Sequence, residues 1–253
     1  MALYVYFVST RNGQVIDQLA YDGADFSWRS VTLYAQRLLD ALPAVSGVAG
    51  LVLTLVIAAV RRRWRALIIA FGAAGAAAAT TQILKYVILD RPDFGVEGYA
   101  GNSFPSGHTT AAAASAMAVF LVSSPRARAA VAAWGTAFSV LAGVSTLANQ
   151  WHRPSDVIAA LLVVAFWGCL AGALLETGRP APVRSGGVFA TAWWVVAPFV
   201  LVTAVSFLVT FRSAANGSES ANTVLAYIGG ASAIITVGFV LALVATRTFS
   251  RLP

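Results

Sequence analysis

The residues of this chain that could carry out chemistry stand in three polar clusters, at 85–92, 105–108 and 149–156, with apolar runs between them. The chain has two histidines and a single lysine, and all three lie in these clusters, whereas the other sixteen basic residues are arginines. Snorkelling from a helix end would explain the lysine alone. It would not explain all three residues, so the clusters predict one functional site.

The third cluster contains the candidate nucleophile, His152. Asp156 follows four residues later, so the two side chains share one side if a helix begins near Pro154. A carboxylate on one ring nitrogen fixes the imidazole tautomer and makes the other nitrogen a better nucleophile or base. A plain helix start, with Pro154 in its first turn and Ser155 or Asp156 as a cap, fits the same residues equally well.

The second cluster predicts an anion site at the start of a helix. Pro105-Ser106-Gly107 leads into a Thr/Ala run and places His108 in the opening turn, where free N–H groups and the helix dipole favour a phosphate. Gly107 permits close approach of a ligand to the backbone, and Ser106 adds a hydroxyl donor. His108 would then be a natural proton donor to a leaving group. Taken alone, the same residues are also typical of an ordinary helix cap.

The first cluster supplies positive charge. Lys85 closes an apolar run and Arg91 follows in the loop. Arginine binds phosphate oxygens through two hydrogen bonds, lysine acts as a point charge, and Pro92 stiffens the turn that presents Arg91. Together the clusters predict a phosphate pocket with a histidine nucleophile, a histidine acid and cationic groups.

The order of a Lys…Arg-Pro segment, a Pro-Ser-Gly-His segment and a His-x-x-x-Asp segment resembles the type 2 phosphatidic acid phosphatase superfamily. These membrane lipid phosphatases are related to bacterial acid phosphatases and vanadium haloperoxidases. The resemblance covers about residues 66–175. It implies that His152 attacks phosphorus to form a phosphohistidine, that Asp156 orients it, and that His108 protonates the leaving group. The phosphoryl oxygens would be held, with no metal or other cofactor, by Lys85, Arg91, Ser106 and the Gly107 amide.

Two features depart from the family pattern. Five residues instead of six separate Lys85 from Arg91, and one residue fewer would rotate a helix by about 100°. The pattern also has Ser-Arg six residues before the nucleophilic histidine, where this chain has Ser145-Thr146. Loss of one donor to a developing oxyanion typically costs about 10²–10³ in rate. We expect Thr146 to donate a weaker hydrogen bond to the substrate, with Asn149 or Gln150 as further contributors. The side chain of Arg153 is expected to point elsewhere.

The composition indicates an integral membrane protein, because 58% of the residues are apolar, 11% are charged, and apolar runs near 20 residues recur. The net charge of +7 comes from arginines in short bursts between these runs. This pattern is typical of membrane orientation and argues against a nucleic-acid partner. Cys169 is the only cysteine, so neither a disulfide nor a cysteine metal site is expected. Histidine ligation of a haem or metal is disfavoured because both histidines stand among Pro, Gly, Ser and Asp.

Seven apolar runs predict an all-α polytopic bundle with six or more spans. They lie at about 43–60, 66–84, 107–123, 129–147, 157–175, 188–211 and 223–245. We expect one membrane domain, 1–253, with the motifs in a core at 66–175 and additional C-terminal spans at 188–245.

Residues 1–42 are expected to hold a partial first span and an amphipathic outer segment. Charged and aromatic residues mix between 11 and 40, which fits a helix at a membrane face or a loop with one short helix. In the second run, Gly72 and Gly75 predict close helix packing.

Basic residues set the expected orientation. Ten arginines occupy alternate loops: Arg61, Arg62, Arg63, Arg65, Arg126, Arg128, Arg179, Arg184, Arg247 and Arg251. The positive-inside rule places these loops in the cytoplasm, so all three polar clusters face outward. The preference for arginine over lysine favours a bacterium with a GC-rich genome, and with it a plasma membrane location.

We therefore expect an outward-facing phosphatase that acts on a membrane lipid, either a phospholipid or an isoprenoid phosphate or pyrophosphate. Thr146 and the altered spacing leave a second hypothesis, a catalytically weakened protein that binds lipid phosphates or acts as a scaffold. A phosphotransferase would use the same phosphohistidine and also stays open. Transport is disfavoured because no apolar run carries an ionisable residue near its centre.

Overall fold

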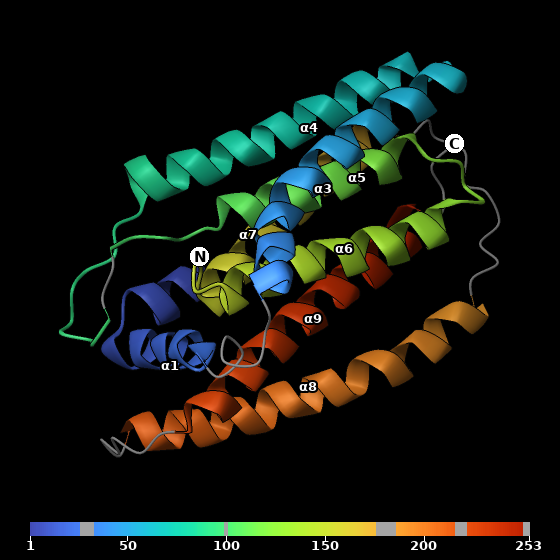
Figure 1. Ribbon diagram of the computed structural model, residues 1–253. Coiled ribbons are helices and arrows are strands. Elements are labelled where there is room, and N and C mark those ends of the chain that lie inside the picture. The colour runs from blue at the N-terminus through green and yellow to red at the C-terminus, as the bar shows by residue number, and fades with distance from the viewer. Residues whose placement is uncertain (26–32, 99–100, 176–185, 216–221, 250–253) are drawn as a thin grey trace.

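A computed structural model of the chain describes residues 1–25, 33–98, 101–175, 186–215 and 222–249. These residues form helices and no strands (Figure 1), which is the all-α class that the apolar runs predict. The elements are η1 (Tyr4–Val8), α1 (Arg11–Asp22), α3 (Leu33–Val60), α4 (Trp64–Ile83), η2 (Leu84–Ile88), α5 (Gly107–Val122), α6 (Arg128–Ala148), α7 (Pro154–Leu175), α8 (Gly186–Ala215) and α9 (Thr223–Thr248), where η marks a π-helical turn.

Five stretches of the described residues are long and apolar enough to cross a membrane: Trp64–Ile88, Arg128–Ala148, Pro154–Leu175, Trp193–Ala215 and Thr223–Thr248. Of the two remaining predicted runs, one lies in α3, where the apolar stretch is Gly47–Val60, and the other forms α5, Gly107–Val122; both stretches are shorter. The 16 residues of α5 rise about 24 Å, less than the ~30 Å of a hydrocarbon core. The protein is therefore a multi-pass membrane protein, and a count of six or more spans stays a prediction.

Local sequence determines where the helices of the motif region begin. Ser106 caps α5, because its hydroxyl accepts the backbone N–H of Thr109 at 3.2 Å. Pro154 opens α7, a position that suits proline since the first helical N–H has no partner within the helix. The capping residues thus place the Pro-Ser-Gly-His and His-x-x-x-Asp segments at the first turns of two helices.

Consecutive helices run in alternate directions, so the end of α4, the start of α5, the end of α6 and the start of α7 meet at one end of the bundle, which we call the motif end (Figure 1). The opposite end carries Arg61, Arg62, Arg63, Arg65 and Arg128, and we call it the arginine end. There the guanidinium of Arg65 donates to the Leu174 carbonyl at 2.8 Å, and that of Arg128 donates to the Phe249 carbonyl at 3.3 Å. These two contacts tie α4 to α7 and α6 to the end of α9.

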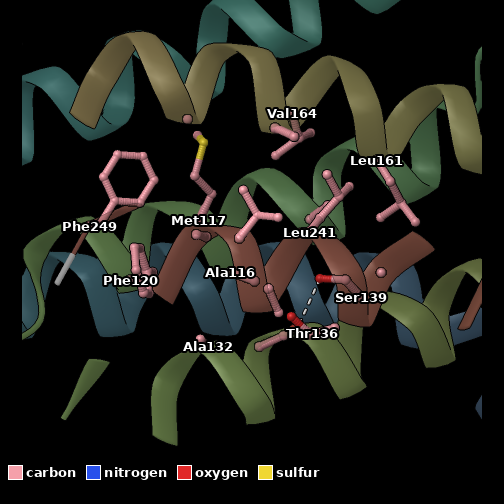
Figure 2. A pocket seen from close by; sticks show the side chains of 18 of the residues that line it. Ala116, Met117, Phe120, Ala132, Thr136, Ser139, Leu161, Val164, Leu241 and Phe249 are labelled. Atoms are coloured by element: carbon pink, nitrogen blue, oxygen red, sulfur yellow. Dashed lines mark hydrogen bonds between the residues drawn. The ribbon is translucent and has the colours of Figure 1, made fainter. Parts of the chain in front are cut away.

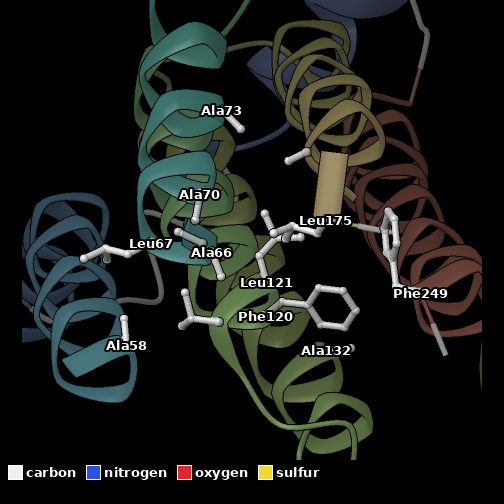
Figure 3. Packing of buried hydrophobic residues seen from close by; sticks show 13 residues of the cluster. Ala58, Ala66, Leu67, Ala70, Ala73, Phe120, Leu121, Ala132, Leu175 and Phe249 are labelled. Atoms are coloured by element: carbon white, nitrogen blue, oxygen red, sulfur yellow. The ribbon is translucent and has the colours of Figure 1, made fainter. Parts of the chain in front are cut away.

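The arginine half of the bundle holds a cluster of buried apolar residues from α3, α4, α5, α6, α7 and the end of α9 (Figure 3). The rings of Phe120 and Phe249 lie 5.8 Å apart there, and a Cβ on Gly172 would meet the Phe249 ring at 1.8 Å. In the same half, α5, α6, α7 and α9 enclose an apolar cavity of about 150 Å³, whose lining includes Met117 and Leu241 (Figure 2). This cavity lies away from the motif end.

Close helix packing occurs at glycines other than the predicted ones. A Cβ on Gly143 of α6 would lie 2.7 Å from the Val157 side chain of α7, and one on Gly50 of α3 would lie 2.4 Å from Ser115 of α5. At Gly72 and Gly75 an added Cβ would meet nothing within 4 Å, and both residues are exposed. The prediction of close packing at these two glycines was wrong, because that side of α4 faces away from the bundle.

Helix α1 packs at the motif end, against η1, α7, α8 and α9. Thr10 caps it by accepting the Gly13 N–H at 3.1 Å, and Gly13 lies so close to the Tyr6 carbonyl that any side chain would collide with it. Within the segment expected to be an amphipathic outer helix, the polar residues Gln14, Asp17 and Gln18 are buried. Residues 26–32 of that segment lie outside the described residues.

Candidate active site

His152 and Asp156 lie together at the start of α7. Nδ1 of His152 is 3.4 Å from Oδ2 of Asp156, and both side chains are buried. The four-residue spacing predicts this pairing, because Pro154 begins the helix between them. A carboxylate at Nδ1 leaves Nε2 of His152 as the free nitrogen, which is the arrangement that a nucleophilic histidine requires.

Asp156 is also bonded to the turn that precedes it. Its Oδ2 accepts the Ser103 hydroxyl at 2.6 Å and the Arg153 backbone N–H at 3.1 Å. A carboxylate at the third helical position that reaches back to the capping residue's N–H is half of a capping box. The carboxylate of Asp156 therefore holds both the first turn of α7 and the imidazole of His152.

His108 faces the pair from α5. Its ring centroid lies 6.0 Å from that of His152 and 5.2 Å from the nearer ring of Trp151, and His108 is exposed whereas His152 is buried. The two histidines of the chain, which are 44 residues apart in the sequence, thus lie close together at the motif end.

Ser106 joins the second cluster to the third. Its backbone N–H donates to the Asp156 carbonyl at 2.9 Å, so the starts of α5 and α7 are fixed to each other. Its side chain is buried, caps α5, and donates to the Thr109 hydroxyl at 3.0 Å. Gly107, by contrast, is partly exposed beside His108, and a Cβ there would come within 3.6 Å of the Gln82 amide.

The first cluster contributes two cations in different environments. Lys85 lies in η2, is partly exposed, and is close enough to His108 for their charges to interact. Arg91 is buried and lies near Asp17 of α1, with which its charge interacts. The loop between them is held by Asn102, whose amide donates to the carbonyls of Lys85 and Leu89 at 2.9 and 2.8 Å.

The π-helical turn η2 surrounds Lys85, where the spacing departs from the family pattern. The Leu89 N–H donates to the Leu84 carbonyl five residues earlier, at 2.9 Å, and the chain leaves the helix at that point. A π-helical turn changes the rotation per residue and often marks a functional position. The local helix therefore differs from a regular α-helix at the altered spacing.

Thr146, expected to contact the substrate, lies beneath the His152 turn. It is fully buried, and its hydroxyl donates to the Gly143 carbonyl at 2.8 Å. Its own carbonyl accepts the backbone N–H groups of Trp151 and His152 at 2.9 and 3.2 Å. A direct contact between the Thr146 hydroxyl and a substrate stays a prediction.

Arg153 points away from the histidines, as expected. Its Nε donates to the Gln18 side chain at 2.9 Å, its Nη1 donates to the Ser103 hydroxyl at 3.2 Å, and its guanidinium lies 5.3 Å from the centre of the Tyr21 ring. These contacts bind it to α1 and the 103 loop, so it is not placed to replace the absent second arginine.

Sequence reasoning missed the residues that support the motif end, which are Gln14, Asp17, Gln18, Tyr21 and Ser103. The residues on α1 have spacings of three and four, which places them on one helix face. Only the structure shows that this face of α1 points into the protein, because the burial of these polar residues could not be predicted from the sequence. Among the described residues, no three His, Cys, Asp or Glu side chains lie together as a metal-ligand group.

Comparison with known proteins supports the resemblance that the motifs predict. No curated protein and no solved structure matches the chain. A family model, described as the PAP2 superfamily, matches residues 66–180, a range that contains the histidine pair, Asp156, Lys85 and Arg91. The region from α4 to just beyond α7 is therefore similar to the PAP2 superfamily, in agreement with the resemblance that the motifs predict.

Proposed function

We propose that this protein is a membrane phosphatase that hydrolyses a lipid phosphate, or an isoprenoid phosphate or pyrophosphate, through a phosphohistidine on His152. The superfamily supports a phosphatase-type activity. One observation carries the mechanism. The ring centroids of the chain's two histidines lie 6.0 Å apart, and Nδ1 of the buried one, His152, faces the carboxylate of Asp156.

In this mechanism Nε2 of His152 attacks phosphorus while the bond from phosphorus to the leaving oxygen breaks. His108 donates a proton to that oxygen, then accepts one from the water that attacks the phosphohistidine, so that phosphate and the free enzyme are released. Asp156 stabilises the positive charge that develops on the imidazole. Lys85, Arg91 and the Gly107 amide would neutralise the phosphoryl oxygens.

The position of the site supports a lipid substrate. The histidines stand at the end of a bundle whose outer faces are apolar, so a tailed substrate can keep its chain in the bilayer while its phosphate reaches the motif end. The clustered arginines Arg61–Arg65 and Arg128 lie at the opposite end, and the positive-inside rule then favours an outward-facing site. For a bacterial chain that surface is the outer face of the plasma membrane.

The test is phosphate release by the purified protein in detergent with EDTA, using phosphatidic acid, an isoprenoid pyrophosphate and phosphatidylglycerol phosphate. We expect His152→Ala to abolish release and labelled phosphate to be trapped on the wild-type protein. His108→Ala is expected to be impaired far more on lipid substrates than on p-nitrophenyl phosphate, whose leaving group needs little protonation. Unchanged release by His152→Ala would refute the mechanism.

A second candidate is a protein that binds lipid phosphates without turnover. The observation that favours it is the missing second arginine, since the Thr146 hydroxyl is bonded to Gly143 and Arg153 is bonded to Gln18 and Ser103. This candidate predicts saturable binding of the same lipids with no phosphate released. Steady-state release that depends on His152 would exclude it.

A further inference from the structure

Helix α1 lies outside the region matched by the superfamily model, yet it contacts the 150–155 turn at three points. The Tyr21 hydroxyl donates to the Gln150 carbonyl. The Gln18 side chain accepts from Arg153 at 2.9 Å. The third contact is made by Asp17 and is the most deeply buried.

Asp17 caps α7 from another helix. Its Oδ1 accepts the backbone N–H of Ser155 at 3.1 Å, and its Oδ2 accepts the Ser155 hydroxyl at 2.6 Å. Ser155 is the second residue of α7, so its N–H is one of the four at the helix start that no residue of the helix itself can satisfy. At this helix start Asp156 accepts the N–H of Arg153, Pro154 has no N–H, and Asp17 accepts the N–H of Ser155.

We propose that Asp17 is a positioning residue for the His152–Asp156 pair, acting through Ser155. This inference rests on the proposed function, because the pair matters for the reaction only if His152 is the nucleophile. Asp17 touches neither histidine in the structure, and its role is to hold the first turn of α7 in the orientation that aims Asp156 at Nδ1 of His152.

The geometry explains why the turn depends on Asp17. Ser155 lies between the two members of the pair and is buried, and Asp17 accepts both of its donors, the backbone N–H and the hydroxyl. Asparagine keeps an acceptor for only one of these donors, so the first turn shifts as the Ser155 hydroxyl finds another partner. The separation of 3.4 Å between His152 and Asp156 is already long for a hydrogen bond, so a small further displacement breaks it.

The contacts of Gln18 and Tyr21 allow the positioning role of Asp17 to be tested by substitution. Both neighbours hold the 150–153 part of the turn independently of Asp17, so α1 stays docked when the carboxylate is removed. Asp17→Asn keeps the shape and one acceptor oxygen, and Ser155→Ala removes only the hydroxyl from the other partner. Asp25→Asn is the matched control, with the same change of charge at an exposed position.

The first measurement, NMR of the histidine rings, does not depend on enzymatic activity. The chain has only two histidines, so ¹⁵N-histidine NMR in detergent gives two ring spin systems, which His108→Gln assigns. In the wild type and in Asp25→Asn, we expect the His152 ring to carry its proton on Nδ1 alone. In Asp17→Asn we expect a mixture of Nδ1–H and Nε2–H tautomers, with the His108 signals unchanged. A single unchanged His152 tautomer in Asp17→Asn would overturn the proposal.

The kinetic arm measures the consequence. Displacement of a catalytic group by about 1 Å can cost about 10²-fold in rate, so we expect kcat to fall about 10- to 100-fold in Asp17→Asn, with KM unchanged. Ser155→Ala should cause part of this loss, and the double variant should be no slower than Asp17→Asn. Unchanged kcat in Asp17→Asn would overturn the inference while leaving the proposed function intact. A wild type without turnover would instead refute the proposed function, and the tautomer would still decide the positioning role.

Discussion

Replacement of Asp17 by asparagine should make the protein more stable at neutral pH, although we expect it to reduce activity. Burial raises the pKa of the Asp17 carboxyl from 3.8 to about 6, and the nearby Asp156 carboxylate adds to the rise, while the Ser155 hydrogen bonds and Arg91 oppose it. The folded protein therefore keeps a proton over a pH range in which the unfolded chain has lost it. The contribution of Asp17 to stability should therefore fall as the pH rises from about 4 to about 6 and stay level above that.

The magnitude follows from the same pKa. Each pH unit between the folded and unfolded values corresponds to about 1.4 kcal/mol, so ionised Asp17 costs the folded state up to about 3 kcal/mol. Asparagine keeps an oxygen that accepts the Ser155 N–H and carries no charge, so the variant avoids this cost. Asp17 also lines a cavity of about 70 Å³ with Thr203 and Ser206, and hydration of that space would reduce the difference.

The assay is unfolding in detergent between pH 4 and pH 8, followed by tryptophan fluorescence, with Asp25→Asn as the control. At pH 4 wild type and Asp17→Asn should unfold at the same midpoint. At pH 7 the variant should be more stable by about 1–3 kcal/mol, which is about 2–12 °C in Tm for a chain of this size. A difference that does not change with pH, or a wild type that is the more stable protein at pH 7, would refute the reasoning.

Three further substitutions test the structure around the site. Gly143→Ala should destabilise the protein by about 1–3 kcal/mol in the same unfolding assay, since its Cβ would lie 2.7 Å from the stiff Val157 side chain; unchanged stability would contradict this contact. Gln150 has φ of +52°, so glycine there should be more stable than alanine by about 1 kcal/mol, and a more stable alanine variant would argue against this backbone conformation. Thr146→Val should change kcat by less than about threefold, because its hydroxyl is already bonded to Gly143; a larger loss of kcat at unchanged stability would support the predicted contact with the substrate.

Much of the helical scaffold could be predicted because its physical causes are local. An apolar run in a membrane can satisfy its backbone only as a helix, and each of the seven predicted runs corresponds to a helix of the structure, at least over its described part. The pairing of His152 with Asp156 follows from the turn of one helix. Which side of a helix faces its neighbours is not local, and the exposed Gly72 and Gly75 illustrate this.

The contribution of α1 could not be predicted for a related reason. Gln14, Asp17 and Gln18 are polar, and polar residues beside aromatic ones normally indicate a surface that meets water or lipid head groups. Here they face inward, because the starts of helices and the loops of the motif end leave backbone groups that need partners. The Pro92 carbonyl, bound by Gln14 at 2.8 Å, and the Ser155 N–H, bound by Asp17, are two such groups.

The link between Asp17 and Ser155 also sets an order of events during synthesis, because 138 residues separate the two partners in the chain. At about 5–20 residues per second, a ribosome needs about 7–28 s to make the intervening segment. Until α7 has been inserted, the carboxylate of α1 lacks the partner that it has in the finished fold. The turn that carries His152 would then take its shape only after most of the helices are in the membrane, so a nascent chain should acquire the proposed activity late and in a single step.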